Sequence, residues 1–222
     1  PDLRMAHIVP HWNWPERVGK VTPVHVFTSG DEGELFLNGR SLGRRKKVPG
    51  DFKRAYRLTW DDVVYEPGTV KVVTYRDGKP WAEASVSTTG PAARLLLEPE
   101  TTELKADGDD LVFVNLRVVD EEGRTVPHSR IPVEFALEGP GEILGVGNGN
   151  ANEFEPFTET DSRRLFNGKA MAVIRRTGAG PIRLKVSADG LESAEAVFDG
   201  SCVPEVRWVD GRDIPVEGLD FR

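Results

Sequence analysis

The chain has 222 residues, enough for one or two domains, and its 23 glycines and 16 prolines favour short strands joined by tight turns over helices. Its formal net charge of −7 argues against the basic surface of a nucleic-acid-binding protein, and no apolar run reaches the ~18 residues of a membrane span. The single cysteine, Cys202, excludes an internal disulfide and a zinc site built on paired cysteines.

Residues 1–20 are predicted to form an extended arm. Pro10 and Pro15 break any helix and bias the residues before them towards extended geometry. Trp12 and Trp14 are two positions apart, so in an extended arm both rings project to the same side and form one aromatic surface.

A first sandwich domain is predicted over residues 21–89. Residues 24–27 and 34–37 alternate with the period of two that a strand with one buried face requires. Asn38-Gly39 is a strong hairpin signal, because a type I′ turn needs positive φ at both central residues, so residues 35–37 should fold back onto 40–42. Further strands are expected at residues 56–60, 69–75 and 81–87, with a second hairpin at Asp77-Gly78.

A linker is predicted at residues 89–91, where Gly90 and Pro91 stop the strand pattern, and a second sandwich domain at residues 91–200. Its strands are expected at residues 93–97, 111–119, 131–137, 170–175, 182–187 and 194–198. About seven strands at this spacing are typical of an immunoglobulin-like sandwich. The tail, residues 201–222, forms either a small hairpin around Asp210-Gly211 or no regular structure. The predicted fold class is all-β, with two tandem immunoglobulin-like antiparallel β-sandwiches.

Two motifs resemble bacterial family 2 glycoside hydrolases of the β-galactosidase type. HWNW at residues 11–14, followed by PVHVFTSGDEGELFLNGRSLG, resembles the segment after the catalytic barrel, and GPGEILGVGNGN with RLFNGKAMAVIR resembles the last sandwich domain. The resemblance covers residues 6–198. It implies non-catalytic C-terminal domains that brace the parent's own catalytic barrel, with residues 1–20 leaving that barrel. It also implies a parent that hydrolyses terminal β-glycosides with retention, in the periplasm or outside the cell.

Trp12 and Trp14 are the candidate functional residues. The resemblance implies that they pack at the interface with the barrel, while tryptophan rings also stack on the apolar faces of sugars. One alternative is therefore a carbohydrate-binding module that uses Trp12, Trp14 or Trp81. Another is an adhesion or spacer array of bacterial immunoglobulin-like repeats. We expect no catalytic residue, no cofactor and no metal site in this chain.

Several other motifs have a simpler structural interpretation. Asn152-Glu153 repeats the family's acid/base dipeptide, but it follows a glycine-rich loop and not a barrel strand, so we expect no catalysis from Glu153. Residues 145–150, GVGNGN, lead into no helix and are interpreted as a tight turn and not as a phosphate loop. The basic run at residues 44–47 is expected to be a solvated loop.

Metal ligands are sparse in this sequence. Asp107, Asp109 and Asp110 are interpreted as an exposed turn, with a local calcium site as the alternative. The four histidines show no metal-ligand spacing, and Cys202 has no partner that would activate it as a nucleophile.

Overall fold

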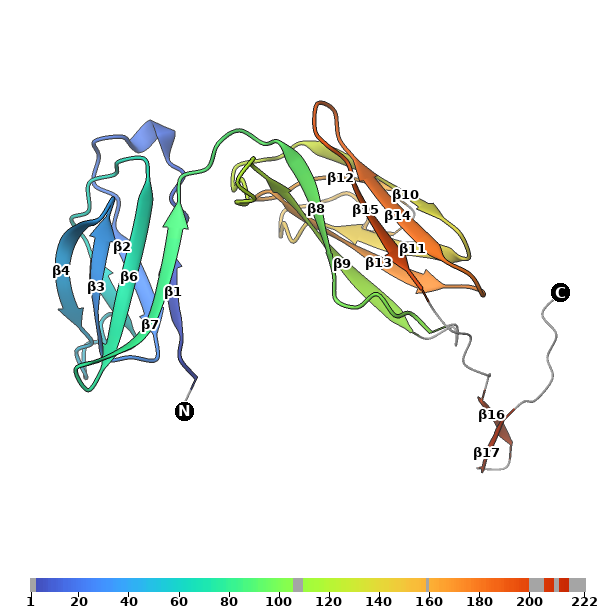
Figure 1. Cartoon of the computed structure of the whole chain (residues 1–222), viewed down its shortest axis with the longest axis horizontal. Coiled ribbons are helices and arrows are strands. Elements are labelled where there is room, and N and C mark those ends of the chain that lie inside the picture. The colour runs from blue at the N-terminus through green and yellow to red at the C-terminus, as the bar shows by residue number, and fades with distance from the viewer. Residues whose placement is uncertain (1–2, 106–109, 159, 200–205, 210–211, 216–222) are drawn as a thin grey trace. The chain divides into compact units, whose positions relative to one another are not determined.

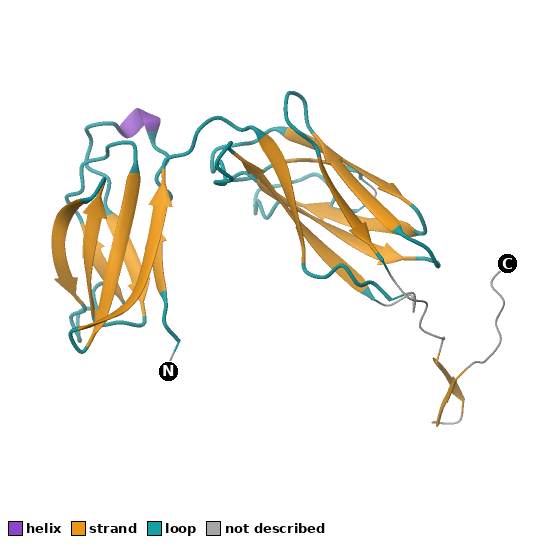
Figure 2. Cartoon of the chain, viewed as in Figure 1, coloured by secondary structure: helices purple, strands orange, loops and turns teal. Residues whose placement is uncertain are grey.

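The structure, a computed structural model, describes residues 3–105, 110–158, 160–199, 206–209 and 212–215. The chain divides into two compact units, Pro1–Thr89 and Gly90–Arg222 (Figure 1). The described residues form antiparallel strands and a single short 3₁₀ helix, η1 (Pro15–Arg17), as Figure 2 shows. The all-β sandwich fold is confirmed. None of these residues belongs to a helix of the length and apolarity that membrane crossing demands.

The first unit is a sandwich of two sheets. One has the order β1-β2-β5, with β1 (Ala6–Val9), β2 (Val24–Thr28) and β5 (Arg57–Trp60). The other has the order β4-β3-β6-β7, with β3 (Glu32–Leu37), β4 (Arg40–Lys46), β6 (Thr69–Arg76) and β7 (Lys79–Ser87). The core between them consists of Ile8, Trp12, Val24, Val26, Leu35, Leu37, Leu58, Trp60, Val63, Tyr65, Val70 and Val72.

Both predicted hairpins of the first unit are confirmed. Asn38 and Gly39 have φ of 50° and 80°, and Leu37 pairs with Arg40. At the second hairpin, Asp77 has a φ of 51°. These positive angles are the ones that a type I′ turn requires, which explains why Asn-Gly and Asp-Gly occupy these positions.

The predicted N-terminal arm begins with an integral strand of this sandwich. β1 pairs in antiparallel fashion with β2, and Ile8 is only 4% exposed. The prediction of an arm over residues 1–20 is therefore wrong for β1. The buried Ile8 pairs with Val26 on β2, which makes β1 part of the sandwich.

The second unit is also a two-sheet sandwich. The sheet β12-β10-β14-β15 comprises β10 (Pro132–Glu138), β12 (Ser162–Arg164), β14 (Ile182–Ser187) and β15 (Ala194–Phe198). The sheet β11-β13-β9-β8 comprises β8 (Arg94–Pro99), β9 (Leu111–Val119), β11 (Gly141–Gly147) and β13 (Lys169–Arg176). In β9, the predicted inner face is confirmed, since Val112, Val114, Leu116 and Val118 are all buried.

Two strands of the second unit differ from the prediction. Gly145 and Gly147 lie in strand β11 and do not form the tight turn expected of residues 145–150, although Gly149 has a positive φ of 73°. The short β12 was not expected. In the tail, β16 (Val206–Val209) pairs with β17 (Arg212–Pro215). Of the two alternatives for the tail, a small hairpin or no regular structure, this pairing supports the hairpin.

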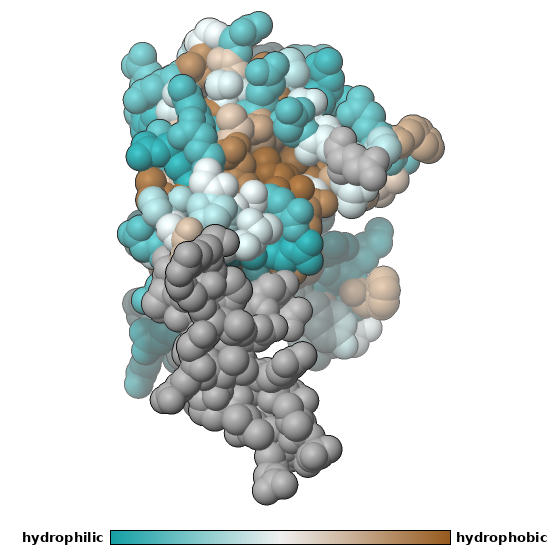
Figure 3. Space-filling model, turned by 90° about the vertical axis from the view of Figure 1, so that its right-hand side faces the viewer, coloured by the Kyte–Doolittle hydropathy of each residue, from teal (hydrophilic) through white to brown (hydrophobic). Residues whose placement is uncertain are grey.

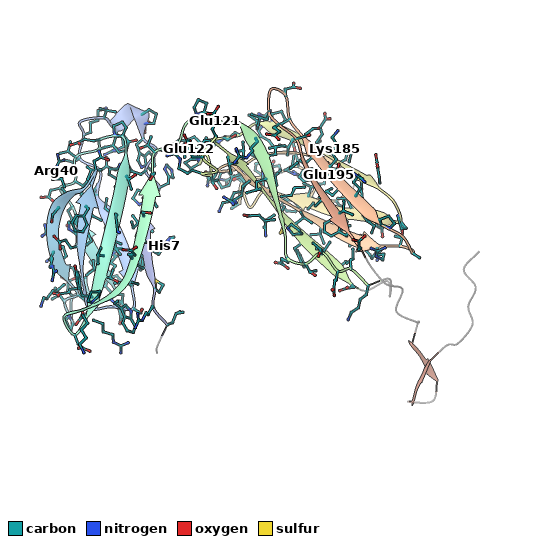
Figure 4. All side chains as sticks on the ribbon, viewed as in Figure 1. His7, Arg40, Glu121, Glu122, Lys185 and Glu195 are labelled. Carbon is teal, nitrogen blue, oxygen red and sulfur yellow. The ribbon has the colours of Figure 1, made fainter. Side chains whose placement is uncertain are left out.

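Charged side chains are exposed on both units. Lys185 and Glu195 oppose each other across β14 and β15, and Arg40 forms an ion pair of 2.8 Å with Glu66 (Figure 4). Hydrophobic residues nevertheless gather in a hollow on the face that Figure 3 shows.

Candidate functional site

Trp12 belongs to the core of the first unit. Its side chain is 1% exposed, its ring centroid lies 4.8 Å from that of Tyr65, and its indole N–H donates to the Glu66 carbonyl at 2.9 Å. A ring in this position offers no surface to a sugar or to a neighbouring domain. The expectation that Trp12 serves as an exposed contact residue is therefore wrong.

Trp14 does not share a surface with Trp12. It is half-buried, stacks on His11 with ring centroids 4.4 Å apart and an interplanar angle of 17°, and donates its indole N–H to the His11 carbonyl at 2.8 Å. The expected single aromatic surface fails because the chain is not extended here: Trp14 immediately precedes η1. Whether Trp14 contacts a barrel or a sugar stays a prediction.

Backbone and side chains around Trp12 fix the end of the first unit. The hydroxyl of Thr88 donates to the Trp12 carbonyl at 2.7 Å. The Asn13 amide forms two bonds to Thr89: its Nδ2 donates to the hydroxyl at 2.6 Å, and its Oδ1 accepts the backbone N–H at 2.8 Å. Asn13 is 8% exposed, so these bonds are shielded from water. The HWNW segment therefore anchors the residues that follow β7.

A buried carboxylate anchors the start of the second unit. Asp120 is fully buried and accepts the backbone N–H of Gly90 at 2.9 Å and that of Arg124 at 2.8 Å. The Arg124 guanidinium also bonds to it, at 2.7 and 2.8 Å. Burial alone would raise the pKa of Asp120, but the Arg124 side chain and the two backbone N–H groups outweigh it and lower the pKa to about 2.

The second unit should therefore lose stability in acid through Asp120. Its folded pKa lies below the ordinary 3.8, so the ionised form contributes stability above pH 4, which is lost as the pH falls from about 4 to 2. The shift corresponds to about 2 kcal/mol. Urea titrations followed by circular dichroism should show a smaller loss over this range in Asp120→Asn. The control is Glu122→Gln, which removes an exposed partner of the same arginine; equal pH dependence in all three proteins would contradict this assignment.

Trp81 is not available as a flat platform. The guanidinium carbons of Arg4 and Arg76 lie 5.1 and 4.9 Å from its ring centroid, and its indole N–H donates to Ser29 at 2.8 Å. With Trp12 in the core as well, the carbohydrate-binding alternative rests on Trp14 alone.

Glu153 has the environment of a loop residue. Its carboxylate accepts hydrogen bonds from the Asn148 amide at 3.0 Å and from the backbone N–H groups of Phe154 and Glu155. The Asn148 bond and these N–H groups lower the pKa of Glu153. A general acid needs the opposite shift.

The basic run at residues 44–47 is largely strand, not loop. Arg44 pairs with Glu34 at 3.2 Å, and Arg44 and Lys46 pair with Glu32 at 3.6 and 3.1 Å. These charges are matched by acidic neighbours on β3.

No group of three or more histidine, cysteine, aspartate or glutamate residues in the described ranges has the arrangement of a metal site. Cys202, Asp107 and Asp109 lie outside these residues. Asp110 accepts the backbone N–H of Lys105 at 2.8 Å.

Comparisons with known proteins agree with the two sandwich units. Residues 95–197 match the model of the glycoside hydrolase family 2 C-terminal domain 5, and residues 19–82 match a domain of unknown function, DUF4982. The chain is 38% identical over 194 residues to the β-galactosidase BoGH2A of Bacteroides ovatus, covering 87% of this chain and 22% of that protein. It is 35% identical over 176 residues to a putative β-glucuronidase of Formosa agariphila, covering 77% of this chain and 16% of that protein.

Solved structures show the same partial correspondence. A β-glycosidase from Bacteroides vulgatus matches with a TM-score of 0.81 and 27% identity, over 88% of this chain and 24% of that one. A glycosyl hydrolase family 2 member from Bacteroides cellulosilyticus matches with a TM-score of 0.80 and 32% identity, over 87% of this chain and 24% of that one. The chain spans less than a quarter of each of these relatives. It belongs with the C-terminal accessory domains of glycoside hydrolase family 2.

Proposed function

We propose that this chain is the non-catalytic part of a longer hydrolase of the β-galactosidase type, which cleaves terminal β-glycosides with retention, and that it braces the enzyme's catalytic barrel. The observation that carries the proposal is the partial match: 87% of this chain corresponds to only 22% of a β-galactosidase. Retaining hydrolysis uses two carboxyl groups about 5 Å apart, which a barrel holds at the ends of parallel strands. The described sheets are antiparallel sandwiches. A periplasmic or extracellular location is part of this proposal and rests on the family resemblance alone.

The chain by itself should not hydrolyse glycosides. We expect no turnover of aryl β-galactosides or aryl β-glucuronides above the rate in buffer. Glu153→Gln is the matched variant, because Glu153 carries the only sequence hint of an acid/base residue. Turnover that is present in the chain and absent from Glu153→Gln would refute the non-catalytic assignment.

The bracing role is tested in the intact protein. Deleting the segment that corresponds to this chain should lower the melting temperature of the intact protein and its yield of active enzyme. The reason is that an interface covered by these domains would become exposed. The intact and the shortened protein are compared at equal concentration directly after synthesis. This timing matters because this chain, added separately, should not restore a barrel that has already aggregated. Unchanged stability and activity in the shortened protein would refute bracing.

A further inference from the structure

The outer face of the sheet β11-β13-β9-β8 has apolar side chains at positions where the solvent face of an antiparallel sheet is commonly polar. Alternation along β13 buries Ala170, Ala172 and Ile174, and turns Met171 and Val173 outwards. On β9 the outward residues include Phe113, which is 37% exposed and pairs with Val173. This face therefore offers apolar contact area that the core does not use.

Part of this face is hollowed into a slot of about 450 Å³, which we call the β11 slot. Its floor is formed by strands β11 and β13, and the ring of Phe157, which is 51% exposed, forms one wall. The slot is lined by Asn115, Gly145, Val146, Gly147, Asn148, Gly149, Phe157, Lys169, Ala170, Met171 and Val173. Small-molecule sites have volumes of roughly 300–1,000 Å³, so the slot is of a size for one small ligand.

Glycines create the hollow. Gly145 and Gly147 lie opposite Val173 and Met171 in the sheet, and they share the outward face while Val146 between them is buried. A Cβ at Gly145 would come within 2.9 Å of the Phe157 carbonyl oxygen, which also accepts the Val146 N–H at 2.7 Å. The chain around Phe157 can run this close to β11 only because residue 145 has no side chain.

A buried arginine holds the Phe157 wall in place. The side chain of Arg163 is fully buried, and its guanidinium donates to the backbone carbonyls of Glu155 and Pro156. Its guanidinium carbon lies 5.4 Å from the Phe157 ring centroid. These contacts fix the backbone just before Phe157, so the wall is a supported part of the fold.

The charge of the lining is positive in an acidic chain. Lys169 is the one ionisable residue among the lining residues of the slot, and Asn115, which is exposed, adds an amide at the rim. Two carboxylates lie beside the lining: Glu98, opposite Asn115, forms an ion pair with Arg117 and also interacts with Lys169, and Glu153 accepts a hydrogen bond from Asn148 at 3.0 Å. An anionic group at the rim would therefore meet an ammonium group and an amide, with no carboxylate among the lining residues to repel it.

We propose that the β11 slot binds a small amphipathic aromatic anion, with its flat ring against Phe157 and Met171 and its carboxylate or sulfonate at Lys169. Apolar walls favour a ring over a saccharide, because most sugar hydroxyls would lose water without gaining a partner. A second copy of the chain is a poorer occupant, because a stable interface buries about 800 Å² per partner and this slot accommodates one ring. The inference does not depend on the proposed role in a hydrolase.

To test the proposal, the full 222-residue chain is titrated with 2-naphthoate, and binding is followed as saturable changes in NMR chemical shifts. Gly147→Leu should weaken binding at least about tenfold, since the added side chain fills the slot; a Cβ there makes only an ordinary 3.6 Å contact with Phe157, so the fold tolerates it. Phe157→Ala should weaken binding similarly. Lys169→Gln should weaken binding about two- to fivefold, as expected for an exposed ion pair.

Matched controls lie on the same molecule. Phe113→Ala removes an exposed ring from the same sheet face outside the slot, and Lys185→Gln removes an exposed ammonium group from the other sheet; both should bind as the unaltered chain does. The neutral analogue 2-naphthalenemethanol should bind more weakly and be insensitive to Lys169→Gln. The proposal is overturned if 2-naphthoate shows no saturable binding at millimolar concentration, if Gly147→Leu and Phe157→Ala bind unchanged, or if galactose or glucuronate binds the slot in its place.

Discussion

Trp12→Ala is expected to destabilise the first unit by about 3–5 kcal/mol, the usual cost of deleting a fully buried large aromatic side chain. The ring is 1% exposed, packs on Tyr65, and donates to the Glu66 carbonyl. The loss should appear in this chain without any neighbouring domain, because every one of these contacts lies within the unit. A large loss in the isolated chain distinguishes a core residue from an interface residue.

Tryptophan fluorescence during urea unfolding measures this effect selectively. Four of the five tryptophans lie before Gly90 and the fifth is Trp208 in the tail, so the signal reports mainly on the first unit, with the buried Trp60 as a remaining probe. Trp14→Ala is the control and should cost less, since its ring is only half-buried, packing against the core from outside and stacking on His11. Similar losses for the two substitutions would contradict the different roles assigned to them.

Arg176→Met is expected to destabilise the second unit by about 3 kcal/mol. The side chain is 1% exposed, and all of its hydrogen bonds within the described residues go to backbone carbonyls: those of Leu104, Gly178, Gly180 and Phe198. Hydrogen bonds to a charged group contribute about 1.5–3 kcal/mol each, and the cost of burying the guanidinium offsets part of the sum. Methionine of similar length fills the space but leaves these carbonyls without a donor.

The neighbouring arginine provides the control. Arg175 is on the other face of β13 and pairs with Glu142, with about two fifths of each side chain exposed. Arg175→Met should change the free energy of unfolding by less than about 1 kcal/mol. Far-UV circular dichroism in urea reports both β-sandwich units, and the transition that tryptophan fluorescence does not follow is that of the second unit. If the two substitutions have equal effects, the carbonyl contacts of Arg176 contribute little to stability.

Local patterns predicted most of the strands. Residues 111–119 and 182–187 were predicted with the bounds that β9 and β14 have, because the period of two and the bounding turns are visible in short windows. The hairpins at Asn38-Gly39 and Asp77-Gly78 could be predicted because these residues readily adopt the positive φ that the turns require. Strand β11 escaped prediction because glycine has no side chain to show alternation, and its glycines instead resemble a turn.

Tertiary contacts account for the rest. Trp12 is buried because it contacts Tyr65 and Glu66, which are more than 50 positions away in the sequence. The two-residue spacing between Trp12 and Trp14 does not indicate these contacts. Arg163 and Arg176 are fully buried although arginine is almost always exposed. The β11 slot combines a glycine strand, a loop phenylalanine and a buried arginine. Gly145, Phe157 and Arg163 lie close together in the sequence, but no periodic pattern links them, so the sequence does not indicate that they meet.

Strand β1 also determines how the first unit can be excised and reused. A fragment cut at residue 21, where the hydrophobic pattern starts, would leave β2 as a new sheet edge, since the order of that sheet is β1-β2-β5. Unpaired backbone groups on an exposed strand with alternating valines are a template for pairing with other chains. Such a fragment would also lack Trp12, and with it a large part of its core. Its failure should appear as concentration-dependent aggregation, and the same domain begun before Ala6 should remain monodisperse.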